Sequence, residues 1–476
     1  MSQNLTFLRV TLLTLTFLTT ASADIPNGQS LYRQTCAGCH GINLEGGQAQ
    51  SLIDAVWQFG SKRSHIFRNV KYGIADFAMP AFEGGLSDKQ INDILDYVFE
   101  AETKSGAQKP GLPSKAFSLD YELEIETVLE TLDIPWGLAF PSDDEILITE
   151  RGGTLSLFNE NTEVLMPIRG LPEVVAEGQG GLLDVAVGPE GSEDKWVYLA
   201  YSHALESQGQ QRAPAMTKII RGKVVNGEWQ QQQDIYKAPE SLYLETRHHY
   251  GSRIVFDRDG YLYFGIGDRG LSHHAQDLGR PNGKIHRIHA DGSIPKDNPY
   301  TSNPNALPSI FCLGHRNPQG LAVHPSTGRL WESEHGPMGG DELNVIDPSA
   351  NYGWPVVTYG RNYNGNIISE RVSHLGMQQP KLYWKPSIAV CGIDFVKGNL
   401  FPRWKDGLLV GALKYEELRL LTISAESVIH QEILLKNAGR VRDVSCRNSG
   451  EIYLALNGPD AIIRLTPGRD LNLGSD

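Results

Sequence analysis

Cys36, Cys39 and His40 form a Cys-x-x-Cys-His motif near the amino terminus. Two thiols at this spacing can each form a thioether bond to a vinyl group of haem, and the histidine that follows is placed to ligate the iron. A haem held in this way carries electrons rather than binding substrate. The alternative is a structural zinc site or a disulfide turn, but the chain has no second Cys/His pair at zinc spacing. The motif predicts c-type haem attachment.

Met79 lies about forty residues after this motif, where small c-type cytochromes place the sixth ligand of the iron. Pro80 follows it, and a loop methionine before proline suits a ligand held on irregular backbone. His65 is a rival ligand, and filling the core is the alternative role for Met79. We predict that Met79 is the sixth ligand.

A second set of polar residues is distributed over the rest of the chain. If they meet, one lysine, three arginines and a histidine make a strongly cationic site, which in a chain of net charge −13 indicates a multiply anionic ligand. A neutral imidazole beside a carboxylate is also a general-base arrangement. Taken singly, each residue is a solvated loop charge or part of a structural ion pair. The set is Gln179, His249, Asp268, His315, Arg316, Asn317, His335, Lys414, Arg440 and Arg442.

Each of these residues stands just before or just after a strand of a repeated pattern. Six short runs of alternating apolar residues are each followed by a turn and a second strand. The first strands are expected at 137–140, 184–187, 253–256, 320–323, 392–395 and 443–446, and the second at 145–150, 195–202, 260–268, 328–336, 407–413 and 450–457. Six all-β units of this size predict a six-bladed propeller over residues 120–470, whose inner strands converge on one site. A β-sandwich or two smaller β domains are the alternatives.

The residues before the propeller predict a small all-α domain at 24–103. Ser87 and Gln90 have the spacing of a helix-capping box, and the helix after them has one apolar face, made by Ile91, Ile94, Leu95 and Val98. Residues 104–119 are rich in Gly, Pro, Ser and Lys without apolar periodicity, which predicts a linker.

The amino terminus carries a targeting signal. Residues 5–20 are apolar and are followed by Ala21-Ser22-Ala23, which predicts a signal peptide at 1–23 and a mature chain that starts at Asp24. A hydrophobic anchor is the alternative. Attachment of haem to Cys-x-x-Cys-His takes place outside the cytoplasm, so both signals predict a periplasmic protein. No other segment is expected to insert into a membrane.

Composition excludes some partners and bounds the chemistry of the remaining cysteines. The chain has 476 residues, is 40% apolar and 21% charged, and is acidic without a basic cluster, which excludes a nucleic-acid partner. Cys312, Cys391 and Cys446 could form at most one disulfide. We interpret them as buried free thiols.

Several long motifs carry a family resemblance. Residues 120–468 resemble the soluble PQQ-dependent aldose sugar dehydrogenases of the glucose/sorbosone dehydrogenase family. The matching stretches are 177–183 (EGQGGLL), 265–268 (GIGD), 313–320 (LGHRNPQG), 334–337 (EHGP), 340–344 (GDELN), 351–355 (NYGWP) and 440–443 (RVRD).

The resemblance implies a role for each site residue. His249 would be the general base that takes the proton from the anomeric hydroxyl of the sugar, and Asp268 would orient it. Arg316 would polarise the quinone oxygen of PQQ as hydride arrives from sugar C1. The residues implied to hold the carboxylates and quinone oxygens of PQQ are Gln179, Asn317, Lys414, Arg440 and Arg442.

The resemblance also implies calcium. The backbone carbonyls of Gly336 and Pro337 would ligate a Ca²⁺ that bridges to PQQ, and Asp341 and Glu342 would ligate a second, structural Ca²⁺. Two departures concern the substrate: His335 stands where some relatives carry Gln, and the stretch before Pro386-Ser387 does not match the glucose enzymes. The aldose branch, with a broad sugar range, is the more similar, and the preferred sugar stays open.

The amino-terminal region resembles a class I cytochrome c. A tethered haem would accept electrons one at a time at high effective concentration. The expected protein is a quinohaemoprotein that passes electrons from an aldose to PQQ, to one covalent haem c, and then to a soluble or membrane-bound respiratory carrier. The alternatives are a Ca²⁺-dependent propeller lactonase or other hydrolase with a separate cytochrome, and a ligand-sensing propeller. A single Cys-x-x-Cys-His excludes a two-haem peroxidase.

Overall fold

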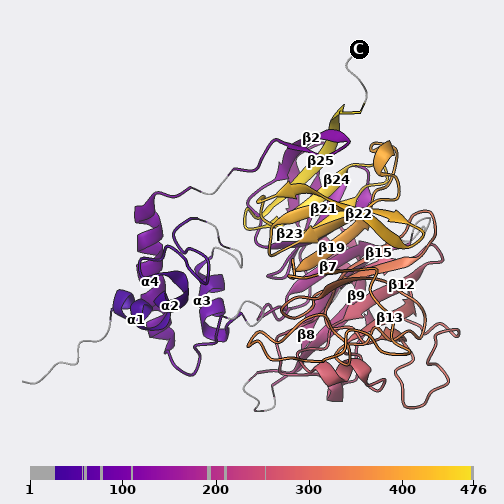
Figure 1. The fold of residues 1–476 in the computed structure, drawn as a ribbon, viewed down its shortest axis with the longest axis horizontal. Coiled ribbons are helices and arrows are strands. Elements are labelled where there is room, and N and C mark those ends of the chain that lie inside the picture. Colours follow the sequence, from indigo (N-terminus) through magenta and orange to yellow (C-terminus); the bar gives the residue numbers. More distant parts are fainter. Residues whose placement is uncertain are drawn as a thin grey trace, which may run out of the picture.

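Residues 27–472 are described by the computed structural model, apart from residues 56, 58–61, 75–78, 109–110, 190–194, 208, 210–211 and 252. The predicted signal peptide at 1–23 lies outside the described residues. The chain forms a small helical unit and a larger body of β-sheets, which lie next to each other in Figure 1. The predicted fold class, a small all-α domain followed by an all-β six-bladed propeller, is confirmed.

In the described residues, four α-helices form the amino-terminal unit. They are α1 (Gly28–Thr35), α2 (Ala37–His40), α3 (Arg63–Tyr72) and α4 (Asp88–Ser105). Ser87 and Gln90 form the predicted capping box at the start of α4. The predicted apolar face of α4 is buried against α1 and α3 in one core cluster. This packing positions α2, which carries the haem motif.

The β body consists of six antiparallel sheets, five with four strands and one with five. Blade one contains β3 (Pro135–Ser142), β4 (Glu145–Glu150), β5 (Thr154–Asn159) and β6 (Val164–Pro167). Blade two contains β7 (Leu182–Val187), β8 (Val197–Ala204), β9 (Ala215–Val225) and β10 (Glu228–Tyr236). Blade three contains β11 (Ile254–Phe256), β12 (Tyr261–Ile266), β13 (Lys284–His289) and β14 (Ile310–Leu313).

The other three blades complete the ring. Blade four contains β15 (Pro318–Val323), β16 (Leu330–Glu334), β17 (Asp341–Val345) and β18 (Leu382–Trp384). Blade five contains β19 (Val390–Phe395), β20 (Leu408–Ala412), β21 (Glu417–Ser424) and β22 (Ser427–Lys436). Blade six contains β23 (Arg440–Cys446), β24 (Ile452–Asn457), β25 (Ala461–Asp470), β2 (Tyr121–Leu129) and β1 (Lys115–Phe117). Short 3₁₀ helices are η2 (Glu240–Leu242), η3 (Ser272–Gln276) and η4 (Pro402–Trp404).

The six predicted strand pairs are the first two strands of the six blades. The first strands β3, β7, β11, β15, β19 and β23 contact one another from blade to blade around the ring. Adjacent blades share apolar clusters. One such cluster joins Trp331 of blade four to Val390 and Leu408 of blade five. This arrangement brings the loops before the first strands to one end of the propeller.

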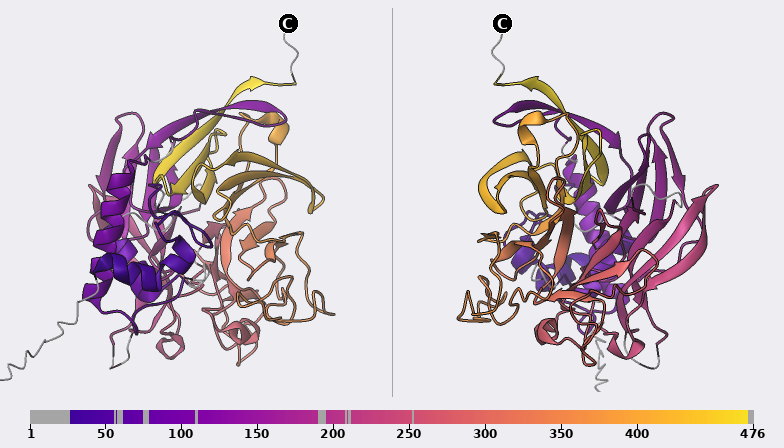
Figure 2. Two further views of the ribbon diagram at one scale, coloured as in Figure 1. Left: turned by 60° about the vertical axis from the view of Figure 1, so that its left-hand side comes forward. Right: turned by 90° about the vertical axis from the view of Figure 1, so that its right-hand side faces the viewer.

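The two ends of the propeller sequence meet in blade six. Strand β2 pairs antiparallel with β25, with Tyr121 opposite Asp470 and Glu124 opposite Thr466. The two strands lie side by side in Figures 1 and 2. Strand β1 pairs with β2, so residues 115–117 of the predicted linker belong to the sheet, and α4 extends to Ser105 at the other end of that range. Pairing of β2 with β25 closes the ring.

A buried ion-pair network holds the inner strands together. Arg253, just before β11, lies 2.8 Å from Asp184 of β7 and 3.0 Å from Asp443 of β23. It also donates to the carbonyls of Gln319 and Arg442. Burial opposes its charge, but the two carboxylates more than offset this and raise the pKa of Arg253. We call these three side chains the axial network.

In the described part of the chain, no helix combines the length and the apolar character that crossing a membrane requires.

Candidate active site and haem-binding loops

A cavity of about 550 Å³ opens at the end of the propeller where the first strands begin. Its size is typical of small-molecule sites, which span about 300–1,000 Å³. We call it the main cavity. Loops of several blades line it because each inner strand starts at this end. Among its lining residues are the predicted Gln179, Asn317, His335, Pro337, Asp341, Lys414, Arg440 and Arg442.

His249 and Asp268 form a buried pair beside the main cavity. His249 Nδ1 lies 2.6 Å from Asp268 Oδ1, and Trp354 Nε1 donates to Asp268 Oδ2 at 2.8 Å. Burial raises the pKa of Asp268, but His249 and Arg316 outweigh it, so the pKa lies below its usual value. An ionised Asp268 fixes the proton on Nδ1 of His249 and leaves Nε2 as the acceptor. This is the geometry of a general base, although the neighbouring residues His248 and Tyr250, not His249 itself, line the main cavity.

The backbone of His249 is strained. Its φ of 48° lies in the left-handed region, which a non-glycine residue adopts only when its surroundings enforce it. Gln179 Oε1 accepts a hydrogen bond from His249 N at 2.6 Å. Gln179 therefore fixes the proposed base, a role that sequence reasoning missed because it assigned Gln179 to cofactor binding.

Arg316 lies on the other side of the pair. Its Nη1 donates to the carbonyls of His335 (3.1 Å) and Gly336 (2.9 Å), and its guanidinium lies 5.6 Å from the ring centre of Trp354. With Gly336 and Glu342 it lines a second cavity of about 10 Å³, which we call the small cavity. His335 lines both cavities, so they adjoin there.

Three of the arginines that line the main cavity, Arg151, Arg440 and Arg442, each have a lowered pKa. Burial, and then the neighbouring Arg442, lowers the pKa of Arg440 to about 9. Burial also lowers the pKa of Arg442 and, together with Arg68, that of Arg151. Arg442 lies 3.8 Å from the ring centre of Trp136, and its Nε has no hydrogen-bond partner among the described residues. A negatively charged ligand beside these arginines would favour their charged forms.

Arg151 was missed by sequence reasoning. It directly follows β4, at the same end of the propeller as the other loops that supply site residues. It donates to the carbonyl of Gly180 at 2.9 Å and to that of Gly178. Arg151 follows the second strand of blade one, as Lys414 follows β20, the second strand of blade five. This shared position was a sequence signal that could have identified Arg151.

The predicted calcium ligands lie in two places. Pro337 O accepts from Ser387 Oγ at 3.2 Å, and the Asp341 carboxylate accepts from Gly336 N at 3.0 Å and Ala389 N at 2.6 Å. Burial raises the pKa of Asp341 to about 6. Asp341 lines the main cavity and Glu342 the small one, because successive residues of β17 face opposite sides.

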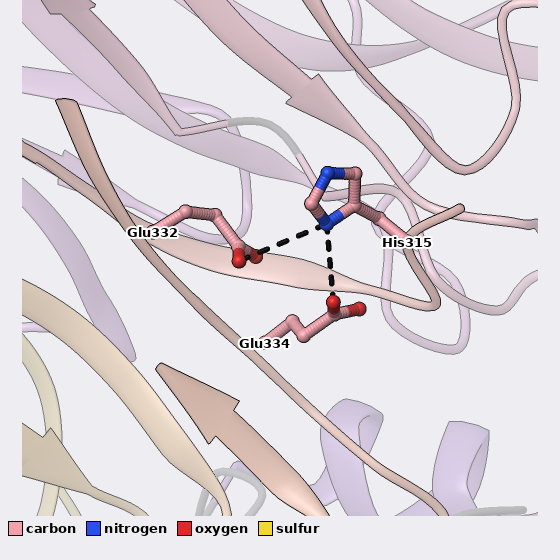
Figure 3. Close-up of side chains that lie close together, drawn as sticks. All are labelled: His315, Glu332 and Glu334. Atoms are coloured by element: carbon pink, nitrogen blue, oxygen red, sulfur yellow. Dashed lines mark hydrogen bonds and ion pairs between the residues drawn. The ribbon is translucent and has the colours of Figure 1, made fainter. Parts of the chain in front are cut away.

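A further buried cluster lies close to the small cavity. Figure 3 shows His315 pointing toward Glu332 and Glu334, with its Nδ1 3.7 Å from Glu332 Oε2 and 3.1 Å from Glu334 Oε1. Their ligand atoms lie within 4.8 Å of one another, close enough to hold a metal ion. Asn344 Nδ2 donates to Glu332 at 3.1 Å. Sequence reasoning missed this cluster. Two glutamates two positions apart on one predicted strand, and therefore on the same face of the sheet, were the signal that could have indicated it.

The haem motif is presented by the start of α2. His40 Nδ1 lies 2.9 Å from the carbonyl of Gln50, which leaves Nε2 for the iron. Met79 pairs through its backbone with Ile74 (2.9 and 3.2 Å) and packs against the core that contains Cys36. His65, the rival ligand, lies 3.5 Å from Asp133 of the propeller. The assignment of His40 and Met79 as the iron ligands stays a prediction.

All five cysteines lie in the described residues, and each is a free thiol. Cys312, Cys391 and Cys446 are buried, which confirms the interpretation that they form no disulfide. Cys36 is half-buried and Cys39 is exposed.

Comparison with known proteins identifies both parts of the chain. The family model "Glucose / Sorbosone dehydrogenase" matches residues 132–464. The chain belongs to this family. Residues 23–98 match the family model "Cytochrome C oxidase, cbb3-type, subunit III". The predictions of a sugar-oxidising oxidoreductase and of an amino-terminal cytochrome c domain are confirmed.

Individual relatives cover each part. Aldose sugar dehydrogenase YliI of Escherichia coli (strain K12) is 36% identical over 72% of this chain and 92% of its own length. The PQQ-bound aldose sugar dehydrogenase of Streptomyces coelicolor is 26% identical, with a TM-score of 0.59 over 75% of this chain and 99% of that one. Cytochrome c6 of Parathermosynechococcus lividus is 36% identical over 18% of this chain and 99% of its own length.

Proposed function

We propose that this protein oxidises aldoses at C1 to lactones, with PQQ as the first electron acceptor and a covalent haem c as the second. The observation that carries the proposal is the buried cationic group Arg151, Arg440 and Arg442 beside the His249–Asp268 pair. An anionic ligand offsets the mutual repulsion of the arginines, and a base stands next to it. The relatives named for aldose oxidation and for bound PQQ support the same substrate and cofactor.

The donor set of the main cavity fits PQQ. Its three carboxylates match Arg151, Arg440 and Arg442, whose forks bind carboxylates bidentately, and Lys414 and Asn317 add further donors to the same wall. The buried Nε of Arg442 that lacks a hydrogen-bond partner among the described residues is one donor such a ligand would satisfy. When bound, PQQ supplies an electrophilic quinone carbon that accepts hydride.

His249 supplies the proton chemistry. Its Nε2 takes the proton of the C1 hydroxyl, and the resulting imidazolium is stabilised by the ionised Asp268 at 2.6 Å. Trp354 holds the second oxygen of Asp268, and Gln179 holds the backbone of His249. Arg316, beside Trp354, stays the predicted cation for the quinone oxygen, although it lines the small cavity and not the main cavity in which PQQ is placed.

Calcium is proposed at the wall between the two cavities. The carbonyls of Gly336 and Pro337, which accept hydrogen bonds from Arg316 and Ser387, would ligate the ion, and Asp341 fixes the loop that carries them through its bond from Gly336 N. A second, structural Ca²⁺ at Asp341 and Glu342 stays a prediction. The two carboxylates face different cavities, so one ion would need the loop to rearrange or other ligands to contribute.

The cytochrome domain supplies the sites for haem. Cys36 and Cys39 would form the thioether bonds, with His40 and Met79 as axial ligands. We also propose that the mature chain begins at Asp24 in the periplasm and passes electrons to a soluble or membrane-bound respiratory carrier.

The test uses purified, haem-matured protein under anaerobic conditions with Ca²⁺. An aldose is added with and without PQQ, and haem absorption is followed. Haem reduction that requires PQQ is the expected result. Reduction of an artificial dye without haem reduction would keep the dehydrogenase and reject the internal transfer. Neither signal with any aldose would reject the proposed substrate class.

A further inference from the structure

The main cavity has a second wall, which comes from the cytochrome domain. Gln48, Asn69, Tyr72, Gly73 and Ile74 line it together with the propeller residues. Asn69 and Tyr72 lie on the last turn of α3, and Gly73 and Ile74 follow that helix. The cytochrome domain therefore covers the cavity in which we place PQQ and the sugar.

Both loops that carry the proposed iron ligands border this cavity. Gln48 precedes Gln50 by two residues, and the carbonyl of Gln50 lies 2.9 Å from Nδ1 of His40. On the other side, Ile74 lines the cavity while its backbone pairs with Met79. Segments next to both proposed iron ligands, His40 and Met79, therefore reach the cavity wall.

The contact between the domains is made by charges of opposite sign. Arg212 Nη2 lies 3.1 Å from Glu83 Oε2, and its guanidinium lies 4.7 Å from the ring centre of Tyr72. This arginine of the propeller thus contacts both the acidic loop before α4 and the end of α3. Because it also lines the main cavity, it lies at the seam between the two walls.

Helix α3 supplies contacts with the reverse polarity. Arg68 Nη1 donates to the carbonyl of Ala176 at 3.0 Å, and Lys62, just before α3, lies 2.6 Å from Asp133. Burial lowers the pKa of Arg68, and the propeller carboxylates Asp133 and Glu177 oppose that effect. Arg68 and Lys62 of the cytochrome domain thus face acids of the propeller, whereas Glu83 of the cytochrome domain faces a propeller cation. Contacts of both polarities fix the orientation of docking.

We propose that this docked arrangement is the state in which electrons pass from the main cavity to the haem, and that the Arg212–Glu83–Tyr72 contact holds it. The inference rests on the proposed function and adds the residues that set the transfer geometry. Oxidation of one aldose to its lactone releases two electrons and two protons. Each electron reduces one Fe(III) to Fe(II), so an external one-electron oxidant must remove two electrons for every sugar, and both protons pass to water.

The test is Glu83→Arg in the full-length protein loaded with haem, PQQ and Ca²⁺. This change places two cations face to face without altering a cavity-lining residue. The rate of haem reduction after mixing with aldose is expected to fall by about 10-fold or more, because two facing cations disfavour the docked orientation while the tether stays intact. Sugar oxidation by an artificial dye is expected to be unchanged. The double variant Glu83→Arg/Arg212→Glu restores the pair, and its haem reduction, relative to its own dye-linked rate, should recover.

Glu100→Arg is the matched control, because Glu100 pairs with Lys104 on the exposed face of α4. Small-angle X-ray scattering of the haem-containing protein without PQQ or sugar gives a second measurement. The radius of gyration should increase for Glu83→Arg and not for Glu100→Arg.

Each outcome separates the two proposals. Haem reduction in Glu83→Arg as fast as in the unaltered protein would overturn the docking proposal alone, as would scattering that shows separated domains in the unaltered protein. Failure of the double variant to recover would also reject the Arg212 contact. Absence of dye-linked sugar oxidation in the unaltered protein would instead overturn the proposed function.

Discussion

The two walls of the main cavity are held by ion pairs that differ in how far water reaches them. On the propeller side, the arginine of the axial network is 7% exposed. On the cytochrome side, the side chains of Arg212 and Glu83 are 26% and 31% exposed. Breaking a buried pair leaves an uncompensated charge and is strongly destabilising, whereas pairs in contact with water contribute about 0–1 kcal/mol each. The propeller wall is therefore a permanent part of the fold, and the cytochrome wall is held by weaker contacts that can be released.

The comparison places the proton chemistry entirely on the propeller wall. His249→Ala should lower dye-linked sugar oxidation by about 10²–10⁴-fold, because it removes the proposed base paired with Asp268. Binding of PQQ and the haem spectrum should stay unchanged. His430→Ala, at an exposed site on β22, is the control. Unchanged turnover in steady-state assays of His249→Ala would reject the assignment of the base.

A substitution in the axial network should destabilise the propeller wall. Arg253→Met should lower the free energy of unfolding by about 3–5 kcal/mol, because Asp184 and Asp443 lose their shared cation. Urea denaturation followed by tryptophan fluorescence measures the change. Arg169→Met, at a side chain 76% exposed, should stay within about 0.5 kcal/mol of the unaltered protein. Equal effects of the two changes would contradict the contrast drawn between buried and exposed pairs.

The cytochrome wall can be altered without touching sugar chemistry. Met79→Ala should change the haem spectrum and lower the reduction potential by about 0.1 V or more, because a methionine ligand raises it. Dye-linked sugar oxidation should not change, since the dye takes electrons at the propeller. Met166→Ala on β6 serves as the control. A spectrum that matches the unaltered protein would assign the sixth position to His65 or to another ligand.

The smallest effect is expected at the most exposed interdomain pair. Lys62→Gln removes the contact with Asp133, in which the lysine side chain is 61% exposed, and should weaken docking by no more than about 1 kcal/mol. Sugar-driven haem reduction, followed by stopped flow at rising salt, should show a modest loss at low ionic strength that disappears as salt screens the pair. Lys89→Gln on α4 should show none. A loss that persists at high salt would mean that the contact is not electrostatic.

Much of the propeller could be predicted because its strands alternate in the manner of half-buried sheets. The six strand pairs were found from that pattern, and the site residues were found because they stand at the ends of those strands. His249 and Asp268 meet for this reason, as do Lys414 and Arg442 at the main cavity.

Contacts between distant segments could not be predicted in the same way. The pairing of Arg212 with Glu83 joins loops without periodicity in two domains, so neither residue carries a local signal. Strand β1 was assigned to the linker because three residues are too few to show alternation. Trp354 was identified only as part of a motif, since its bond to Asp268 depends on how blades three and four pack.

The closure of blade six by β2 and β25 has a consequence for how the chain is made. The partner of β2 belongs to the sixth blade, so the propeller ring cannot close until the strands of all six blades have been synthesised. The cytochrome domain precedes the ring in sequence, and domains generally fold as units from the amino terminus. Its contacts are local by comparison, which favours faster folding. Haem attachment can therefore be complete while the propeller is still an open array of blades, and the docking surface for the cytochrome is finished last.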